Sequence, residues 1–98
     1  MMDIQVRTEL GEIVLRGSCG LDWVETLQHV DEDKFPFLGS MLPYADTMFN
    51  SRQARKLRRE ILHESIRDII GKDAVAEIER LCQQVENGSH LYLWFLGD

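Results

Sequence analysis

The chain has 98 residues and a formal net charge of −6, with 44% hydrophobic and 29% charged residues. This length predicts one domain, because a second domain would lack a core of its own. The apolar content excludes disorder over most of the chain, and the pI near 5.0 argues against general nucleic-acid binding, which needs net positive charge.

The cysteines and the ends of the chain favour a cytoplasmic protein. The first residues, Met1 to Asp3, lack the cationic and apolar regions of a secretory signal peptide. The longest strongly apolar run, residues 91–96, is too short to span a membrane. Cys19 and Cys82 form no Cys-x-x-Cys pattern, so two reduced thiols are expected rather than a disulfide. We therefore expect a cytoplasmic protein that does not bind or cross a membrane.

The chain between residues 3 and 17 predicts a β-hairpin, because apolar and polar residues alternate there. Gly11 would supply the positive φ that the turn requires. A turn at this position sets the register and places the paired apolar residues on one buried face. The pairs expected are Val6 with Leu15 and Thr8 with Ile13.

A short helix is predicted over residues 21–30, where apolar residues recur at helical spacing. The stretch 31–49 holds both prolines, Pro36 and Pro43, yet it is rich in large apolar residues that a disordered linker would not carry. We predict a packed loop there, with a short strand or a single helical turn around residues 38–42. Ordered loops of this length are often functional.

The second half of the chain predicts two helices and a strand. Asn50 followed by Gln53 is a capping-box signature, and it predicts the start of a long helix over residues 51–70. A second helix is predicted over residues 73–86. Residues 90–96 are apolar on both faces, which is typical of a central strand covered on both sides. The predicted fold is α+β: a small antiparallel sheet, made of the N-terminal hairpin and the C-terminal strand, packed by two or three helices.

No pattern in the chain assigns a reaction. His63 and Glu64 lack the second histidine of zinc proteases, because Arg67 occupies its place. His29 lies near acidic residues, and we interpret it as part of a solvated helix end rather than a metal cluster. Residues 17–20 are glycine-rich but lack the lysine of a phosphate-binding loop, so a turn is expected. We predict no catalytic residue, no metal and no cofactor.

Five cationic side chains lie within eight residues at the start of the predicted long helix. The helix dipole disfavours cations there, and a sequence that breaks a local rule often does so at a functional site. One interpretation is a solvated face neutralised from within the fold, for example by Asp22, Glu25 or Asp46. Lys56 and Glu60 would then form a local pair. The other is a site for a carboxylate-rich or phosphate-bearing partner. The cations are Arg52, Arg55, Lys56, Arg58 and Arg59, and all except Arg58 are assigned to this anion-binding patch.

The segment from residue 22 to residue 37 offers a surface of the opposite sign. Five carboxylates within twelve residues are followed by two aromatic residues that we expect to be exposed. Such a surface would suit a cationic protein, with an aromatic anchor at its centre. Ordinary solvated surface charge is the alternative. The expected contact residues are Asp22, Glu25, Asp31, Glu32, Asp33, Phe35 and Phe37.

Asp46 and Thr47 precede the Asn50 cap in the predicted packed loop. An Asx turn, in which Asp46 accepts nearby backbone N–H groups, would explain them structurally, and contact with a ligand is the alternative. Trp94 in the final strand is expected in the core. Pairing of a strand edge with a second copy, which would give a homodimer, is the alternative there.

Two stretches of the sequence are distinctive: Pro43 to Asn50, PYADTMFN, and Tyr92 to Asp98, YLWFLGD. They resemble a group of small uncharacterised bacterial proteins that have a Pro-Tyr-x-Asp-Thr-x-Phe-Asn segment and a Leu-Trp-Phe-x-Gly-Asp C-terminus. The likeness covers residues 35–98. It implies a bacterial cytoplasmic protein and transfers no catalytic residue. The chain departs from this group at residues 52–59, where a more apolar helix start would be expected.

The leading hypothesis is a non-enzymatic protein interaction module, in its most specific form an immunity-type protein that neutralises a basic partner. The small size, the acidity and the lack of a catalytic pattern motivate it. The alternative is a regulatory module that binds phosphate or nucleic acid through the patch at residues 52–59. A third hypothesis is a small-ligand enzyme built around residues 35–50, which would need a pocket lined by Asp46, Tyr44 and a histidine.

Overall fold

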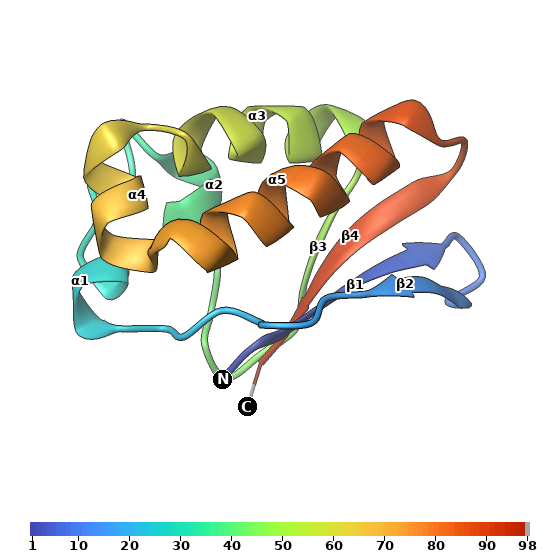
Figure 1. Cartoon of the computed structure of the whole chain (residues 1–98), viewed down its shortest axis with the longest axis horizontal. Helices are drawn as coiled ribbons and strands as arrows, with labels where there is room; N and C mark the ends of the chain where they lie inside the picture. The colour runs from blue at the N-terminus through green and yellow to red at the C-terminus, as the bar shows by residue number, and fades with distance from the viewer. Residues whose placement is uncertain (98) are drawn as a thin grey trace.

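The structure is a computed structural model that describes residues 1–97. Four strands form one antiparallel sheet in the order β2-β1-β4-β3, and the two longest helices pack against one of its faces (Figure 1). This arrangement confirms the predicted α+β class. The strands are β1 (Asp3–Thr8), β2 (Ile13–Arg16), β3 (Thr47–Phe49) and β4 (Leu91–Leu96). The helices are α1 (Glu25–Gln28), α2 (Pro36–Gly39), α3 (Ser51–Ile61), α4 (Glu64–Ile70) and α5 (Lys72–Asn87).

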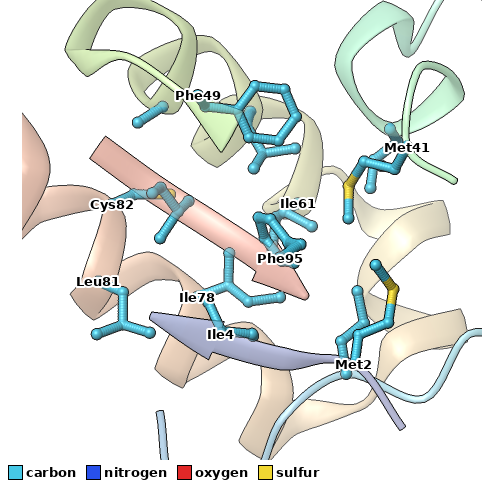
Figure 2. Packing of buried hydrophobic residues seen from close by; sticks show 14 of the residues in the cluster. Met2, Ile4, Met41, Phe49, Ile61, Ile78, Leu81, Cys82 and Phe95 are labelled. Carbon is cyan, nitrogen blue, oxygen red and sulfur yellow. The ribbon is translucent and has the colours of Figure 1, made fainter. Parts of the chain in front are cut away.

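The hydrophobic core lies between one face of the sheet and the two longest helices. Helix α5 packs against β1 and β4, and α3 packs against α5, β3 and β4. The strands contribute Ile4 and Phe95, and the helices contribute Ile61, Ile78 and Leu81 (Figure 2). All of these side chains are fully buried. Removal of this apolar surface from water is the main source of stability.

The hairpin has the predicted turn but only part of the predicted register. Gly11 has a φ of 88°, and Val6 pairs with Leu15 as expected. The pairing of Thr8 with Ile13 is wrong, because a β-bulge makes Ile13 the partner of Arg7. Thr8 instead closes the turn: its N–H donates to the Glu12 carbonyl oxygen at 2.9 Å, and its hydroxyl accepts the Glu12 N–H at 3.2 Å.

The first half of the chain contains less helix than the sequence predicts. The helix expected over residues 21–30 is reduced to α1. The reason is that Leu21 continues the sheet edge, where it exchanges two backbone hydrogen bonds of 2.9 Å with Met2. In the stretch 31–49 the single helical turn is α2, slightly earlier than expected. The same stretch also contains β3, which was not predicted and whose strand conformation comes from its pairing with β4.

The long helix predicted over residues 51–70 is interrupted. It ends at Ile61, because His63 adopts an extended backbone with ψ of 136° and begins α4. The His63 ring supports this break, since Nδ1 accepts the Ser65 N–H at 3.3 Å and the ring packs edge-on against Phe35, with centroids 5.2 Å apart. Gly71, with a φ of 94°, separates α4 from α5, whose bounds enclose the helix predicted over residues 73–86.

Strand β4 is central, as predicted, but it is covered on one face only. Leu93 and Phe95 point toward the helices and are fully buried. Tyr92, Trp94 and Leu96 alternate with them and are half-buried on the opposite face. Within residues 1–97 no helix packs on that face (Figure 1). In the same part of the chain, no helix combines the length and the apolar character that crossing a membrane requires.

Candidate functional site

The five carboxylates of the acidic segment all lie at the surface. Asp22, Glu25, Asp31, Glu32 and Asp33 are exposed. Glu25 lies 3.9 Å from the ring of His29, with both side chains largely in solvent, and Asp31 accepts the Asp33 N–H at 2.9 Å. None of the five forms an ion pair with a lysine or arginine among residues 1–97. Their charge is therefore available to a partner.

The two aromatic residues assigned to this surface are not exposed anchors, and that expectation is wrong. Phe35 is only 7% exposed, because it packs in the core against His63. Phe37 is half-buried and packs edge-on against Phe49, with ring centroids 6.0 Å apart. Both rings therefore hold α2 against the rest of the fold and are not free to anchor a partner.

Another aromatic residue takes the place that the sequence assigned to Phe35 and Phe37. Tyr44 is 84% exposed, and it lines a shallow groove of about 370 Å³ together with Asp22 and Val24. We call this hollow the Tyr44 groove. Its lining residues are Met1, Asp22, Trp23, Val24, Gln28, Pro43 and Tyr44. The sequence placed Tyr44 in a packed loop, and no local pattern distinguishes it from the buried apolar residues of the same stretch, such as Met41 and Phe49.

The basic patch forms one face of α3. Asn50 caps this helix, since its side-chain oxygen accepts the Gln53 N–H at 2.9 Å and the Gln53 side chain accepts the Asn50 N–H at 2.9 Å. Of the five cations only Arg58 is neutralised, through two hydrogen bonds of 2.8 and 2.9 Å to the Glu86 carboxylate of α5. The other four are exposed and form no ion pair within residues 1–97: Arg52, Arg55, Lys56 and Arg59.

The predicted local pair between Lys56 and Glu60 does not form. Glu60 points inward instead, where its carboxylate accepts the Phe37 N–H at 3.1 Å and the Leu38 N–H at 2.9 Å and so caps the start of α2. Burial raises the pKa of Glu60, although these two hydrogen bonds partly oppose the shift. Neutralisation of the patch from Asp22, Glu25 or Asp46 does not occur either. The patch therefore keeps four uncompensated charges.

A shallow groove of about 420 Å³ runs beside the basic patch, between the first turn of α3 and the last turn of α5. Arg52 and Arg55 line one wall, and Glu86 and Asn87 line the other. The hydrogen bonds from Arg58 lower the pKa of Glu86, which burial opposes and the charges of Arg55 and Arg59 support. A carboxylate fixed in the ionised form thus lies at the edge of this groove, and it weakens the attraction for a second anion.

The backbone N–H groups of the glycine-rich turn at residues 17–20 bind a carboxylate that comes from the chain itself. The Glu77 carboxylate of α5 accepts the Ser18 N–H at 2.8 Å, the Ser18 hydroxyl at 2.8 Å and the Cys19 N–H at 2.9 Å. It also accepts the Gly20 N–H at 3.2 Å. Successive backbone N–H groups that form a concave site, called a nest, often bind a free anion, and here the Glu77 carboxylate takes the place of that anion. The sequence predicted a turn here but not its partner, which lies 57 to 59 residues away along the chain.

The structure describes the surroundings of both cysteines and of the two histidines that the sequence singled out. Cys19 and Cys82 are both free thiols, and burial raises the pKa of Cys82 to about 12. His63 caps α4, and His29 lies beside Glu25 at the surface. In residues 1–97 no cluster of histidine, cysteine and carboxylate side chains has the arrangement of a metal site.

Asp46 accepts a hydrogen bond, but not in an Asx turn. Its carboxylate accepts the N–H of Gly97 at 3.1 Å, which ties the start of β3 to the end of β4. The correction has a simple cause, since pairing of β3 with β4 places Thr47 opposite Phe95 and so brings Gly97 beside Asp46. The two stretches that carry the resemblance therefore meet in space.

Replacing Asp46 with Ala should lower the free energy of unfolding by about 1 kcal/mol, the usual net value of one hydrogen bond. The loss arises because the Gly97 N–H is left without its acceptor. Urea denaturation measures it, and Asp46→Asn is the control, since the amide oxygen preserves the acceptor. Equal losses in both variants would mean that charge, rather than the hydrogen bond, is what matters at this position.

Comparison of the chain with protein-family models, with curated proteins and with solved structures found no match. The functional argument therefore rests on the geometry of the two charged surfaces and on the Tyr44 groove.

Proposed function

We propose that the protein is a non-enzymatic interaction module that binds a basic protein partner at the Tyr44 groove, as an immunity-type neutraliser would. One observation carries this proposal: a tyrosine that is 84% exposed shares a groove with Asp22, a carboxylate that forms no ion pair with a lysine or arginine among residues 1–97. Tyrosine is enriched among the residues that dominate binding energies, because its rigid ring buries a large area at little entropic cost.

The charges around the groove suit a basic partner. Asp22 lies in the groove itself, and Glu25 and Asp31 to Asp33 are exposed along the same acidic segment. Carboxylates at the rim of an interface accelerate association with a cationic surface and discourage acidic competitors. Val24 and Pro43 add apolar surface around Tyr44. The groove thus combines an aromatic anchor and apolar surface with a carboxylate, and a polar rim around an apolar centre is the usual composition of a protein interface.

The contacts of the buried and half-buried carboxylates also favour binding over catalysis. Strongly perturbed acids often mark active sites, but here each has a structural partner. Glu77 accepts hydrogen bonds from residues 18–20, and Glu60 caps α2. Glu86 is held by Arg58. The grooves at the surface are open and shallow, and this favours contact with a macromolecule. The resemblance noted for residues 43–50 and 92–98 adds a bacterial cytoplasmic setting to the proposal.

A second candidate function follows from the basic patch, whose four exposed cations form no ion pair within residues 1–97. These cations could bind the phosphates of a nucleic acid or a phosphorylated ligand as a regulatory module. The patch is small, however. The rest of the chain carries −10, which is the net −6 less the four positive charges, and this charge would repel a longer polyanion.

Affinity capture from a native lysate of the source cells tests the proposal, with a basic protein as the expected ligand. Tyr44→Ala should weaken binding of the captured protein at least about tenfold, which corresponds to about 1.4 kcal/mol. Leu10→Ala is the matched control, because Leu10 is 83% exposed at the tip of the hairpin and outside the groove. Isothermal titration calorimetry with the purified partner gives both dissociation constants.

A second pair of variants distinguishes the effect of a charge in the groove on binding from the effect of the net charge of the protein. Asp22→Lys and Glu12→Lys change the net charge equally, and only Asp22 lies in the groove. Asp22→Lys should therefore weaken the complex more than Glu12→Lys does. Capture of nucleic acid that is lost at high salt, in place of a basic protein, would contradict the proposal and favour the basic patch.

A further inference from the structure

The face of the sheet that points away from the helices presents an ordered layer of mostly large side chains. Strand alternation and the strand pairings place these residues together, since Gln5 pairs with Trp94 and Met48 pairs with Trp94 from the other side. We call this surface the open face. Its residues are Asp3, Gln5 and Arg7 of β1, Ile13 and Arg16 of β2, Met48 of β3, and Tyr92, Trp94 and Leu96 of β4.

The open face has Trp94 at its centre, held by contacts with neighbouring side chains. The guanidinium of Arg7 lies 4.8 Å from the centroid of the Trp94 ring, and Arg7 Nε donates to the Gln5 side-chain oxygen at 2.9 Å. These contacts leave Gln5 only 6% exposed, although no helix covers it. Met48, beside Trp94, is 49% exposed. A surface with fixed side chains loses little conformational entropy on binding.

The charges of the open face are arranged so that a second copy complements them. On β1, Asp3 lies two residues before Gln5 and Arg7 lies two residues after it, and all three point the same way. Consider a two-fold axis between two stacked sheets, perpendicular to the strands and passing over Gln5. This axis places Asp3 of each copy over Arg7 of the other, as an isologous contact requires.

The same axis also matches the apolar side chains. Tyr92 pairs with Arg7 and Leu96 pairs with Asp3 across β1 and β4, so Tyr92 of one copy meets Leu96 of the other. Trp94, which pairs with Gln5, lies close to the axis, so the Arg7–Trp94 pairs of the two copies face each other there. We propose that the open face binds a second copy of this chain in a symmetric, sheet-to-sheet homodimer.

The size of the open face sets the expected strength of the dimer. The strands contain six, four, three and six residues, and 19 residues that each occupy about 3.3 Å by 4.8 Å give a plane of roughly 300 Å². Stable interfaces bury about 800 Å² of accessible surface on each partner, and the relief of the side chains supplies part of the difference. We therefore expect a dimer of modest affinity that dissociates in the micromolar range of concentration.

Another occupant fits the open face less well. Aromatic and cationic residues on a sheet can stack and bind single-stranded nucleic acid. Here, however, Arg7 already lies over the Trp94 ring, and the carboxylate of Asp3 would face the phosphates. In the dimer, Asp3 and Arg7 of one copy each face the opposite charge on the other copy. It also leaves the Tyr44 groove free, because no residue of the open face lines that groove.

Analytical ultracentrifugation of the full chain over a range of concentrations tests the dimer. The wild-type protein should show a reversible monomer–dimer equilibrium. Met48→Lys should raise the dissociation constant at least about tenfold, because Met48 pairs with Trp94 near the two-fold axis, where the two introduced charges would face each other. Leu10→Lys adds the same charge at the hairpin tip, 83% exposed and outside the open face, and should leave the equilibrium unchanged. Circular dichroism checks that both variants are folded.

A charge exchange tests the two-fold geometry itself. Asp3→Arg alone and Arg7→Asp alone should each be monomeric, since like charges then face each other across the axis. An equimolar mixture of the two variants should form a heterodimer, because both opposed pairs again carry opposite charges. A wild-type chain that stays monomeric at all concentrations overturns the proposal. So does a dimer that Met48→Lys leaves intact, a mixture that does not associate, or tight binding of an oligothymidylate probe to the monomer through Trp94.

Discussion

Replacing Glu77 with Gln should destabilise the protein by about 3 kcal/mol at neutral pH, because each pKa unit is worth about 1.4 kcal/mol. Burial alone would raise the pKa of this carboxyl. Hydrogen bonds from the Cys19 N–H and thiol and from Ser18 outweigh burial, and they lower the pKa from 4.5 to about 2. Glutamine keeps the shape of the side chain, but it loses the charge and turns an N–H₂ group toward the N–H groups of residues 18–20.

The same pKa shift predicts how the loss depends on pH. The folded pKa of Glu77 lies below the unfolded value, so the ionised carboxylate favours the folded state. Its contribution is complete above the unfolded value of 4.5 and disappears as the pH falls from 4.5 toward 2. The difference in unfolding free energy between wild type and Glu77→Gln should therefore be largest at neutral pH and shrink steadily in that acidic window.

Urea denaturation followed by tryptophan fluorescence at neutral and acidic pH measures this difference. Glu79→Gln is the matched control, since Glu79 lies on the same helix and accepts no hydrogen bond from the turn at residues 17–20. It should change stability by less than about 0.5 kcal/mol, as is usual for substitutions near the surface. A pH-independent loss in Glu77→Gln would show that packing, rather than the charge, makes this contact important.

Glu77 also illustrates what local sequence patterns can and cannot predict. Alternation of apolar residues predicted the hairpin, and the spacing of Asn50 and Gln53 predicted the cap of α3; both are observed. These features depend on residues that are near each other in the chain. The hydrogen bonds from residues 18–20 to Glu77 depend on the position of α5. No pattern within the turn or within α5 indicates that these two segments meet.

The remaining errors in the fold have the same origin. Strand β3 has three residues and exists because β4 lies beside it. The break before α4 occurs at His63, whose ring packs against Phe35 from a distant part of the chain. Helical periodicity continues through residues 61–66, so the sequence predicted one helix where the tertiary contacts support two.

For the candidate site, the sequence located the charges but not the anchor. The exposed carboxylates and cations lie where the charge pattern placed them, because solvation keeps unpaired charges at the surface. Phe35, which was expected to be exposed, is buried, and Tyr44, which was not assigned to the acidic face, is exposed. Both belong to one stretch rich in apolar residues, and only the packing of α2 against α3 determines which of the two rings is buried.

Replacing Gly97 with Ala should destabilise the protein by about 2 kcal/mol, within the usual range for overpacking. A Cβ atom at this position would lie against the backbone of Ala45 and of Tyr44, at distances no real contact shows. Backbone atoms cannot rotate aside as a flexible side chain can, so the end of β4 and the loop before β3 must separate. That movement would also strain the hydrogen bond from Gly97 to Asp46.

Gly11→Ala is the control for this second prediction. It introduces backbone strain but no contact of the added Cβ atom with other atoms. Gly11 has a φ of 88° and nothing within 4 Å of the added Cβ, so it should cost only the conformational strain, about 1 kcal/mol. Chemical denaturation should rank Gly97→Ala as the more destabilising.

Because Gly97 supports the backbone of Tyr44, the same variant should also weaken binding at the Tyr44 groove, whereas Gly11→Ala should not. A Gly97→Ala protein of normal stability and normal affinity would mean that the loop tolerates the shift and that Tyr44 is positioned from elsewhere.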